Sequence, residues 1–263
     1  MIKLIATDMD GTFLDDQNQF PKDFYPIYKK LNEQGIIFGA ASGRQYYNLV
    51  ERFNDIKEEM LFIAENGTYV VYKGKELFSN SLNRETAFEI VKLARTIPDV
   101  NIVVCGKKSA YIETTEPKVL SEVEKYYARR EFVEDLLTVE DDILKIALLD
   151  FKGAEHHSMP YFKEYQQQLQ VTVGGFIWLD IMNSGSNKGV AMEKIQEYLN
   201  ISPDQTMVFG DYLNDLEMMK SAYNSYAMAN AHEKIKEVAR FEAKSNNENG
   251  VMETIKERLS LTI

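Results

Sequence analysis

The chain has 263 residues, of which 44% are hydrophobic and 27% are charged. These proportions exclude a mainly disordered protein, and the length allows one large domain or two modest ones. The formal net charge of −11 argues against a general affinity for nucleic acid, whose phosphates attract Lys and Arg surfaces. A small phosphorylated molecule is still allowed, because a divalent cation and a few lysines or backbone amides neutralise phosphate locally.

Cysteine content and hydropathy indicate the cellular setting. The single cysteine, Cys105, excludes an intramolecular disulfide, and we expect it to be buried in the apolar run 101–105. The N-terminal residues 1–5 begin a strand pattern and do not resemble a signal peptide. Since no apolar run approaches the roughly 20 residues of a membrane-spanning helix, we expect a cytoplasmic protein without a membrane partner.

The first third of the chain alternates short apolar runs with helical patterns. This rhythm of strand, helix and strand predicts a parallel sheet covered by helices and joined by right-handed crossovers. The predicted elements are strand 3–7, helix 22–34, strand 36–41, helix 44–53, strand 61–64, and a hairpin of strands 68–72 and 76–78.

The pattern changes between residues 83 and 185, where strands and helices have the proportions of a separate α+β unit. The elements predicted there are helix 84–96, strands 101–105 and 110–114, helix 118–129, strand 145–151, helix 156–169, and strands 170–173 and 176–182.

The parallel rhythm then resumes with helix 188–199, strand 206–209, helix 213–221, strand 225–228 and two closing helices. We therefore predict an α/β fold with a doubly wound, Rossmann-like parallel-sheet core and an inserted α+β cap domain. The core is expected to consist of residues 1–82 and 186–263, and the cap of residues 83–185.

Two carboxylates directly follow the first predicted strand, in Asp8-Met9-Asp10-Gly11-Thr12. Open α/β sheets bind their ligands at the carboxyl ends of strands, so this pair stands where a site is expected. Neighbouring carboxylates repel each other unless a cation or a shared proton compensates. The pair therefore indicates either a Mg²⁺ site or acid/base chemistry.

Three further segments stand at strand ends or helix starts: Gly210-Asp211-Tyr212-Leu213-Asn214-Asp215, Ser42-Gly43-Arg44 and Asn187-Lys188-Gly189. They offer oxygen ligands, a hydroxyl with loop amides, and a cation, which suit a metal and a phosphate group. Each segment alone is more simply explained as a solvated turn, a helix cap or a surface charge. Their joint occurrence in one α/β core favours a phosphate site.

These segments resemble the four motifs of the haloacid dehalogenase-like (HAD) superfamily. The Asp-x-Asp-Gly-Thr and Gly-Asp-x-x-Asn-Asp motifs, together with the position of the insert, are similar to its Cof-type branch with an α/β cap, subclass IIB. Residues 41–47, 64–67 and 109–111 are similar to bacterial sugar phosphatases. The resemblance implies a Mg²⁺-dependent phosphatase of small phosphate monoesters, with sugar phosphates as the expected substrates.

The resemblance also implies roles for individual residues. Asp8 would attack phosphorus and form an aspartyl phosphate, and Asp10 would act first as general acid and then as general base. Mg²⁺ would be held by the Asp10 backbone carbonyl and by the carboxylates of Asp8 and Asp211, and Asp215 would bind the metal directly or lie just outside its ligands. The transferring phosphate would be bound by four residues: Ser42, Gly43, Lys188 and Asn214.

Several polar residues have no decided role. We expect Thr12 to support its loop, whereas Asn66 could face the substrate or form a turn with Gly67. Arg44 could reach the substrate or cover the start of a helix. The polar positions near the last cap strand are candidates for substrate selectivity: Asp180, Asn183 and Ser184. The three histidines lack metal-ligand spacing relative to the carboxylate motifs, so they receive no catalytic role.

Two other classes of protein stay open. A phosphoacceptor signalling module also carries strand-end carboxylates, but its phosphorylated Asp follows the third strand, where this chain has Glu65-Asn66. A phosphomutase or phosphotransferase of the same superfamily would share Asp8 and the metal, and analysis of the products would distinguish it. A flavin or cofactor-precursor phosphate also stays open as the substrate, and the sequence predicts no oligomeric state.

Overall fold

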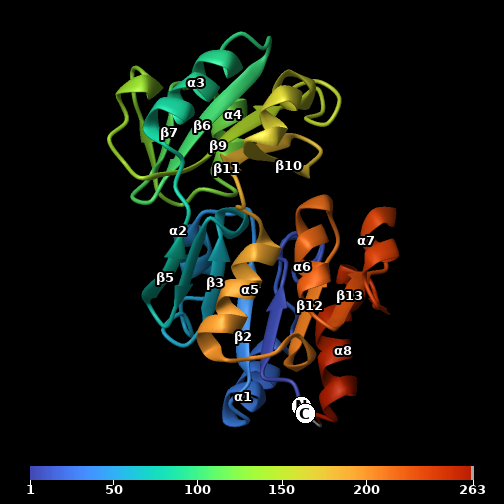
Figure 1. Cartoon of the computed structure of the whole chain (residues 1–263). Helices are drawn as coiled ribbons and strands as arrows, with labels where there is room; N and C mark the ends of the chain where they lie inside the picture. The colour runs from blue at the N-terminus through green and yellow to red at the C-terminus, as the bar shows by residue number, and fades with distance from the viewer. Residues whose placement is uncertain (262–263) are drawn as a thin grey trace.

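The computed structural model describes residues 1–261, which form two sheets. Figure 1 shows the larger sheet and its helices below, the smaller sheet and its helices above, and two chain segments between them. We call the larger unit the core and the smaller unit the cap. The N-terminus and the last residues that the structure describes lie close together at the end of the core that is far from the cap (Figure 1).

The core strands within the described range are β1 (Leu4–Thr7), β2 (Ile37–Ala41), β3 (Leu61–Ala64), β4 (Tyr69–Tyr72), β5 (Lys75–Ser79), β12 (Thr206–Gly210), β13 (Asn224–Met228) and β14 (Phe241–Ala243). They form a sheet in the order β14-β13-β12-β1-β2-β3-β4-β5. The pairs from β14 to β3 are parallel, whereas β4 and β5 add an antiparallel hairpin at one edge. Every residue of β1 is buried, as expected for a central strand covered on both faces.

The core helices pack in separate groups: α5 (Lys188–Leu199) contacts α6 (Leu216–Ser221), α6 contacts α7 (Glu233–Val238), and α1 (Phe24–Glu33) contacts α8 (Gly250–Leu259). The remaining helix, α2 (Tyr46–Arg52), packs on β3. None of the helices within residues 1–261 combines the length and the apolar character that crossing a bilayer requires. The expected cytoplasmic location stays a prediction.

A cluster of phenylalanines anchors the loop that follows β1. Phe13 contacts the rings of Phe20, Phe24, Phe38 and Phe53, and the ring centroids within the cluster are 4.8 to 6.1 Å apart. Phe13 is 1% exposed and directly follows the Asp8–Thr12 loop. Aromatic rings bury large areas and favour such tilted contacts, so this cluster fixes one end of the loop.

The cap strands within the described range are β6 (Val100–Gly106), β7 (Ala110–Ile112), β8 (Arg130–Phe132), β9 (Ile143–Asp150), β10 (Leu169–Gly175) and β11 (Trp178–Asn183). Their order is β10-β11-β9-β6-β7-β8, and all neighbours are antiparallel except β7 and β8. The cap helices are α3 (Arg84–Ala94) and α4 (Pro117–Val123), and α3 packs on β9 and β6. Short 3-10 turns complete the chain: η1 (Glu65–Gly67), η2 (Leu136–Thr138), η3 (Met159–Gln167), η4 (Pro203–Gln205), η5 (Leu213–Asp215) and η6 (Asn246–Glu248).

The two connections between core and cap are bonded to each other. The Asn183 amide donates to the side-chain oxygen of Asn80 at 2.8 Å, and the Asn80 amide donates to the Ser184 carbonyl at 3.0 Å. The chain therefore leaves and re-enters the core at neighbouring points. The exact boundaries, residues 1–82 and 186–263 against 83–185, stay a prediction.

The predicted helix 118–129 is wrong in its second half, because α4 ends at Val123. The backbone carbonyls of Lys125, Tyr126 and Arg129 accept hydrogen bonds from core residues and not from a following helical turn. Tertiary contacts thus override the local helical preference.

Three smaller differences have local causes. The predicted helix 156–169 is the 3-10 segment η3, in which only Phe162 is buried, so little packing supports a longer α-helix. The helix predicted at 213–221 begins with η5, where the Asp215 carboxylate accepts backbone N–H groups. The edge strand β14 was not predicted, since three residues are too few to show an alternating pattern.

We predict that Phe13→Ala lowers the free energy of unfolding by about 3–5 kcal/mol, because it removes a ring from a closely packed cluster. Urea unfolding followed by circular dichroism would measure the loss. The same substitution at Phe132, whose side chain is 56% exposed, should change stability by less than about 0.5 kcal/mol. Equal effects of the two substitutions would contradict a structural role for the cluster.

Candidate active site

Polar side chains follow four adjacent parallel strands. Asp211 follows β12, Asp8 follows β1, Ser42 follows β2 and Glu65 follows β3. Because parallel strands end at the same edge of a sheet, these residues come together there, on both sides of the central strand β1. The cap covers this edge (Figure 1).

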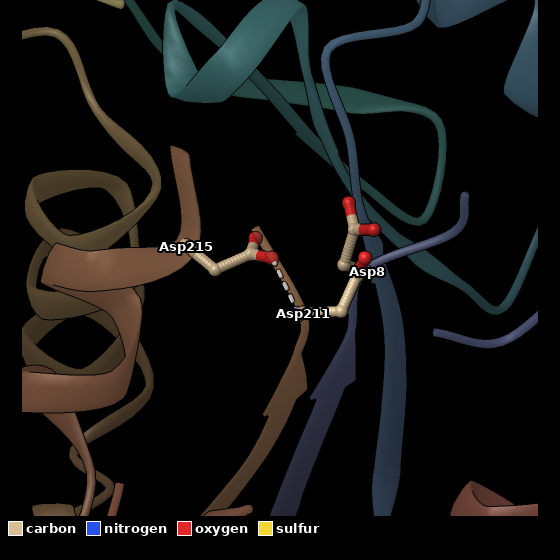
Figure 2. Close-up of side chains that lie close together, drawn as sticks. All are labelled: Asp8, Asp211 and Asp215. Atoms are coloured by element: carbon tan, nitrogen blue, oxygen red, sulfur yellow. Dashed lines mark hydrogen bonds between the residues drawn. The ribbon is translucent and has the colours of Figure 1, made fainter. Parts of the chain in front are cut away.

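Three carboxylates lie close together at this edge. Asp8, Asp211 and Asp215 each offer an oxygen within 4.8 Å of the others. Figure 2 shows Asp8 and Asp211 at the ends of their strands, with the Asp215 carboxylate directed toward Asp211. One Asp215 oxygen accepts the N–H groups of Asp211, at 3.0 Å, and Tyr212, at 3.2 Å, which fixes the carboxylate beside the strand end.

Lys188 supplies the positive charge inside this cluster. Its Nζ lies 2.5 Å from Asp8 Oδ1 and 2.6 Å from Asp215 Oδ1, and its side chain is fully buried. Burial raises the pKa of Asp8 well above its usual value, and the Lys188 charge opposes this rise. Burial disfavours the charged form of Lys188 as well, but Asp215 and Asp8 more than compensate, so the Lys188 pKa is raised.

Asp211 is held by the first loop. The Thr12 hydroxyl donates to Asp211 Oδ1 at 2.6 Å, which agrees with the expected supporting role of Thr12. Burial and the nearby Asp215 charge raise the pKa of Asp211 to about 7, although the Thr12 hydrogen bond opposes this shift. The position before Thr12 requires glycine, because Gly11 has φ +79° and a Cβ there would overlap the Asp211 carboxylate.

Asp10 lies apart from the three-carboxylate cluster. Arg44 donates to both of its carboxylate oxygens, from Nη2 at 2.5 Å and from Nε at 2.7 Å. The Arg44 side chain is 3% exposed, whereas that of Asp10 is 43% exposed. The sequence offered two roles for Arg44, a contact with the substrate or cover for the start of a helix. The structure adds an ion pair with Asp10.

The residues expected to bind phosphate are near the cluster. Ser42 is buried, and its Oγ accepts the Arg44 N–H at 3.2 Å. Asn214 donates to Asn66 Oδ1 at 3.0 Å, and a Cβ on Gly43 would meet the Asn66 amide at 3.1 Å. Asn66 itself has φ 55°, a conformation typical of turns, so it combines the turn with a link between loops.

A cavity of about 70 Å³ separates the strand ends from the cap. It is lined by core residues Asp8, Asp10, Ser42, Gly43, Arg44, Tyr212 and Asn214, and by cap residues Tyr126, Tyr127, Lys145, Gly174, Trp178 and Asp180. Ligand pockets usually measure roughly 300 Å³ or more. The cap therefore lies close on the core, and a substrate larger than a few atoms requires the two to separate.

Sequence reasoning missed Lys145, a buried cap residue. Its Nζ lies 2.9 Å from Glu65 Oε2, 3.3 Å from Asp180 Oδ2 and 2.6 Å from the Gly43 carbonyl. Asp180 also accepts a hydrogen bond from the Asn66 amide. A lysine inside the apolar run 143–149 was the available signal, since a buried lysine requires partners.

The other candidates lie elsewhere. Asn183, the last residue of β11, and Ser184, which follows it, lie where the chain returns to the core and do not line the cavity. The described histidines do not line it either: His157 contacts Asp150, and His232 caps α7. Cys105 is fully buried, as expected.

The donor set at the strand ends fits a divalent cation. Three carboxylates with one lysine leave an excess of negative charge, and oxygen ligands are those that Mg²⁺ prefers. Asp8, Asp211 and Asp215 are therefore compatible with metal binding.

Comparison with known proteins assigns the family. The sequence matches the haloacid dehalogenase-like hydrolases over residues 5–255. The chain belongs to this family. The Escherichia coli K12 protein named 5-amino-6-(5-phospho-D-ribitylamino)uracil phosphatase YbjI is 35% identical over 264 residues, which cover 97% of this chain and 95% of that protein.

Solved structures agree with this assignment. A Streptococcus mutans UA159 protein is 33% identical with a TM-score of 0.91, over 99% of this chain and 100% of that one. A sugar phosphatase of HAD subclass IIB, 17% identical with a TM-score of 0.85 over 98% of this chain and 100% of that one, shares the fold. The predicted family, α/β fold and enzyme class, phosphoric monoester hydrolase, are confirmed.

We predict that Lys188→Met lowers the free energy of unfolding by about 3–5 kcal/mol in metal-free buffer, because it leaves Asp8 and Asp215 buried without a cation. Urea unfolding in the presence of EDTA would measure the change. Lys194→Met is the matched control, since Lys194 is an exposed residue of the same helix and should cost less than about 0.5 kcal/mol. A variant as stable as the wild type would contradict the charge balance described above.

Proposed function

We propose that the protein is a Mg²⁺-dependent phosphatase of small phosphate monoesters that works through an aspartyl phosphate on Asp8. The observation that carries the proposal is the meeting of Asp8, Asp211, Asp215 and Lys188 beneath the cap. A nucleophilic carboxylate, oxygen ligands for a metal and a fixed cation are together the groups that phosphoryl transfer requires.

The proposed reaction has two steps. In the first step, an Asp8 carboxylate oxygen forms a bond to phosphorus, and the bond from phosphorus to the ester oxygen breaks. That oxygen takes a proton from the Asp10 carboxyl group and leaves as an alcohol. In the second step, water attacks phosphorus, gives a proton to the Asp10 carboxylate, and releases inorganic phosphate and free Asp8.

The metal and the phosphate are proposed to share the site. Mg²⁺ would be held by Asp8, Asp211, Asp215 and the Asp10 carbonyl, and when bound it would offset the negative charge of the phosphate. Lys188 would neutralise the transferring oxygens. Ser42, the Gly43 amide and Asn214, which also line the cavity, would donate hydrogen bonds to them.

We propose sugar phosphates as the substrate class. Lys145 and Asp180 on the cap side of the cavity offer a donor and an acceptor for the hydroxyl groups of a sugar. A phosphorylated ribitylaminouracil is the second candidate, because the Escherichia coli relative is named for that substrate. The aromatic residues Tyr126, Tyr127, Trp178 and Tyr212 of the same cavity favour a substrate with a planar ring.

We predict that Asp8→Asn lowers phosphate release on the order of 10³-fold or more, because it removes the attacking oxygen. Release would be measured with p-nitrophenyl phosphate in Mg²⁺ and in EDTA, and EDTA should abolish wild-type activity. Asp204→Asn, an exposed position at the other end of β12, should retain wild-type activity. Activity that survives Asp8→Asn in purified protein would overturn the covalent mechanism.

A panel of substrates would test the proposed class. We expect ribose 5-phosphate or a hexose phosphate to give a higher kcat/KM than p-nitrophenyl phosphate, and to release inorganic phosphate without an added acceptor. Phosphorylated ribitylaminouracil belongs in the same panel. If only that ester reacted, the sugar assignment would fall in favour of the second candidate, and phosphate found on an acceptor sugar would instead indicate a phosphotransferase.

A further inference from the structure

The start of α2 is bonded to the cap segment 125–129. The Gln45 amide donates to the Arg129 carbonyl at 2.8 Å, and the Arg129 N–H donates back to Gln45 Oε1 at 2.8 Å. The Gln45 N–H donates to the Tyr126 carbonyl at 3.1 Å, and the Asn48 amide donates to the Lys125 carbonyl at 3.2 Å. We call these contacts the clasp.

Arg44 connects the clasp to the candidate active site. One side of its guanidinium holds both carboxylate oxygens of Asp10. Its Nη1 donates to Asn48 Oδ1 at 3.0 Å and to the Lys125 carbonyl, and its Cζ lies 4.7 Å from the centre of the Tyr126 ring. A single core side chain therefore touches the cap and the proposed general acid together.

We propose that Arg44 is a positioning residue that couples docking of the cap to the orientation of the Asp10 carboxylate. The proposal rests on the general-acid role of Asp10 proposed above. With the cap docked, the Lys125 carbonyl and the Tyr126 ring fix the guanidinium, which fixes the plane of the Asp10 carboxylate. When the cap moves away, Arg44 loses these two partners and keeps its core contacts with Asn48 and Asn18, so the Asp10 carboxylate is held less rigidly.

The chemistry of the arginine fork suits this role. Two parallel N–H···O bonds set the direction of a carboxylate as well as its place. Each carboxylate oxygen has a second lone pair, so the two bonds to Arg44 leave a place for the proton that Asp10 gives to the ester oxygen or takes from water. Asp10 needs such support because its side chain is 43% exposed.

The small size of the cavity explains why coupling Asp10 to the cap would be useful. A substrate has to enter while core and cap are apart, and the reaction is protected from bulk water only after they close. An Asp10 that is oriented only in the closed state would support proton transfer after the substrate is enclosed.

Two esters of similar size test the proposal. The leaving group of p-nitrophenyl phosphate needs no proton, whereas the alkoxide of benzyl phosphate does, so a misplaced Asp10 slows only the second. The value of kcat/KM depends on the steps up to transfer of the phosphate to Asp8, so the later attack of water does not affect it. We expect Arg44→Lys and Gln45→Ala to raise the ratio of kcat/KM for p-nitrophenyl over benzyl phosphate at least about fivefold.

The controls separate this role from a structural one. Arg95→Lys, the same substitution in an exposed cap ion pair, should leave the ratio unchanged. If Arg44→Lys fails to fold, Gln45→Ala and Asn48→Ala still test the coupling, since both residues belong to the clasp and neither lines the cavity. An equal loss on both esters, or an unchanged ratio in Gln45→Ala, would overturn the proposal. The wild type should hydrolyse both esters, and Asp8→Asn should hydrolyse neither. This result checks the proposed phosphatase function separately from the role of Arg44.

Discussion

The candidate active site depends on one buried ammonium group. Lys188 lies between Asp8 and Asp215, and without it these carboxylates would be buried beside like charges. Its position requires α5 to begin there, and Asn187 caps that start by accepting the Val190 N–H. Gly189 then permits close packing, because a Cβ would lie 2.5 Å from the Glu217 carbonyl carbon on α6. The packing of α5 on α6 thus sets the distance between the lysine and its carboxylates.

The sequence was informative where structure is local. Strand patterns predicted the core, and the residues immediately after each strand predicted Asp8, Ser42 and Asp211 at one edge. It failed where distant segments decide the outcome. The end of α4 depends on hydrogen bonds between residues 77 to 84 positions apart, and the pairing of Arg44 with Asp10 joins residues 34 positions apart. No local pattern records such contacts.

The contacts between cap and core are mostly polar near the cavity. Lys145 of the cap is bonded to Glu65 and the Gly43 carbonyl of the core, and Asp180 of the cap accepts from Asn66 of the core. Polar groups of this kind exchange protein partners for water at little net cost. An interface built from them suits two units that separate and return, whereas an apolar interface would resist opening.

The neighbouring points at which the chain leaves and re-enters the core have an evolutionary consequence. Because Asn80 and Asn183 are directly bonded, an insert of any fold whose ends lie close together could replace the cap without altering the core strands. Duplication and recombination could then replace the whole cap, and with it the substrate preference, while the core keeps its residues for phosphate chemistry. The clasp would be the part that each new insert has to rebuild, so covariation between position 45 and the 125–129 segment would record such exchanges.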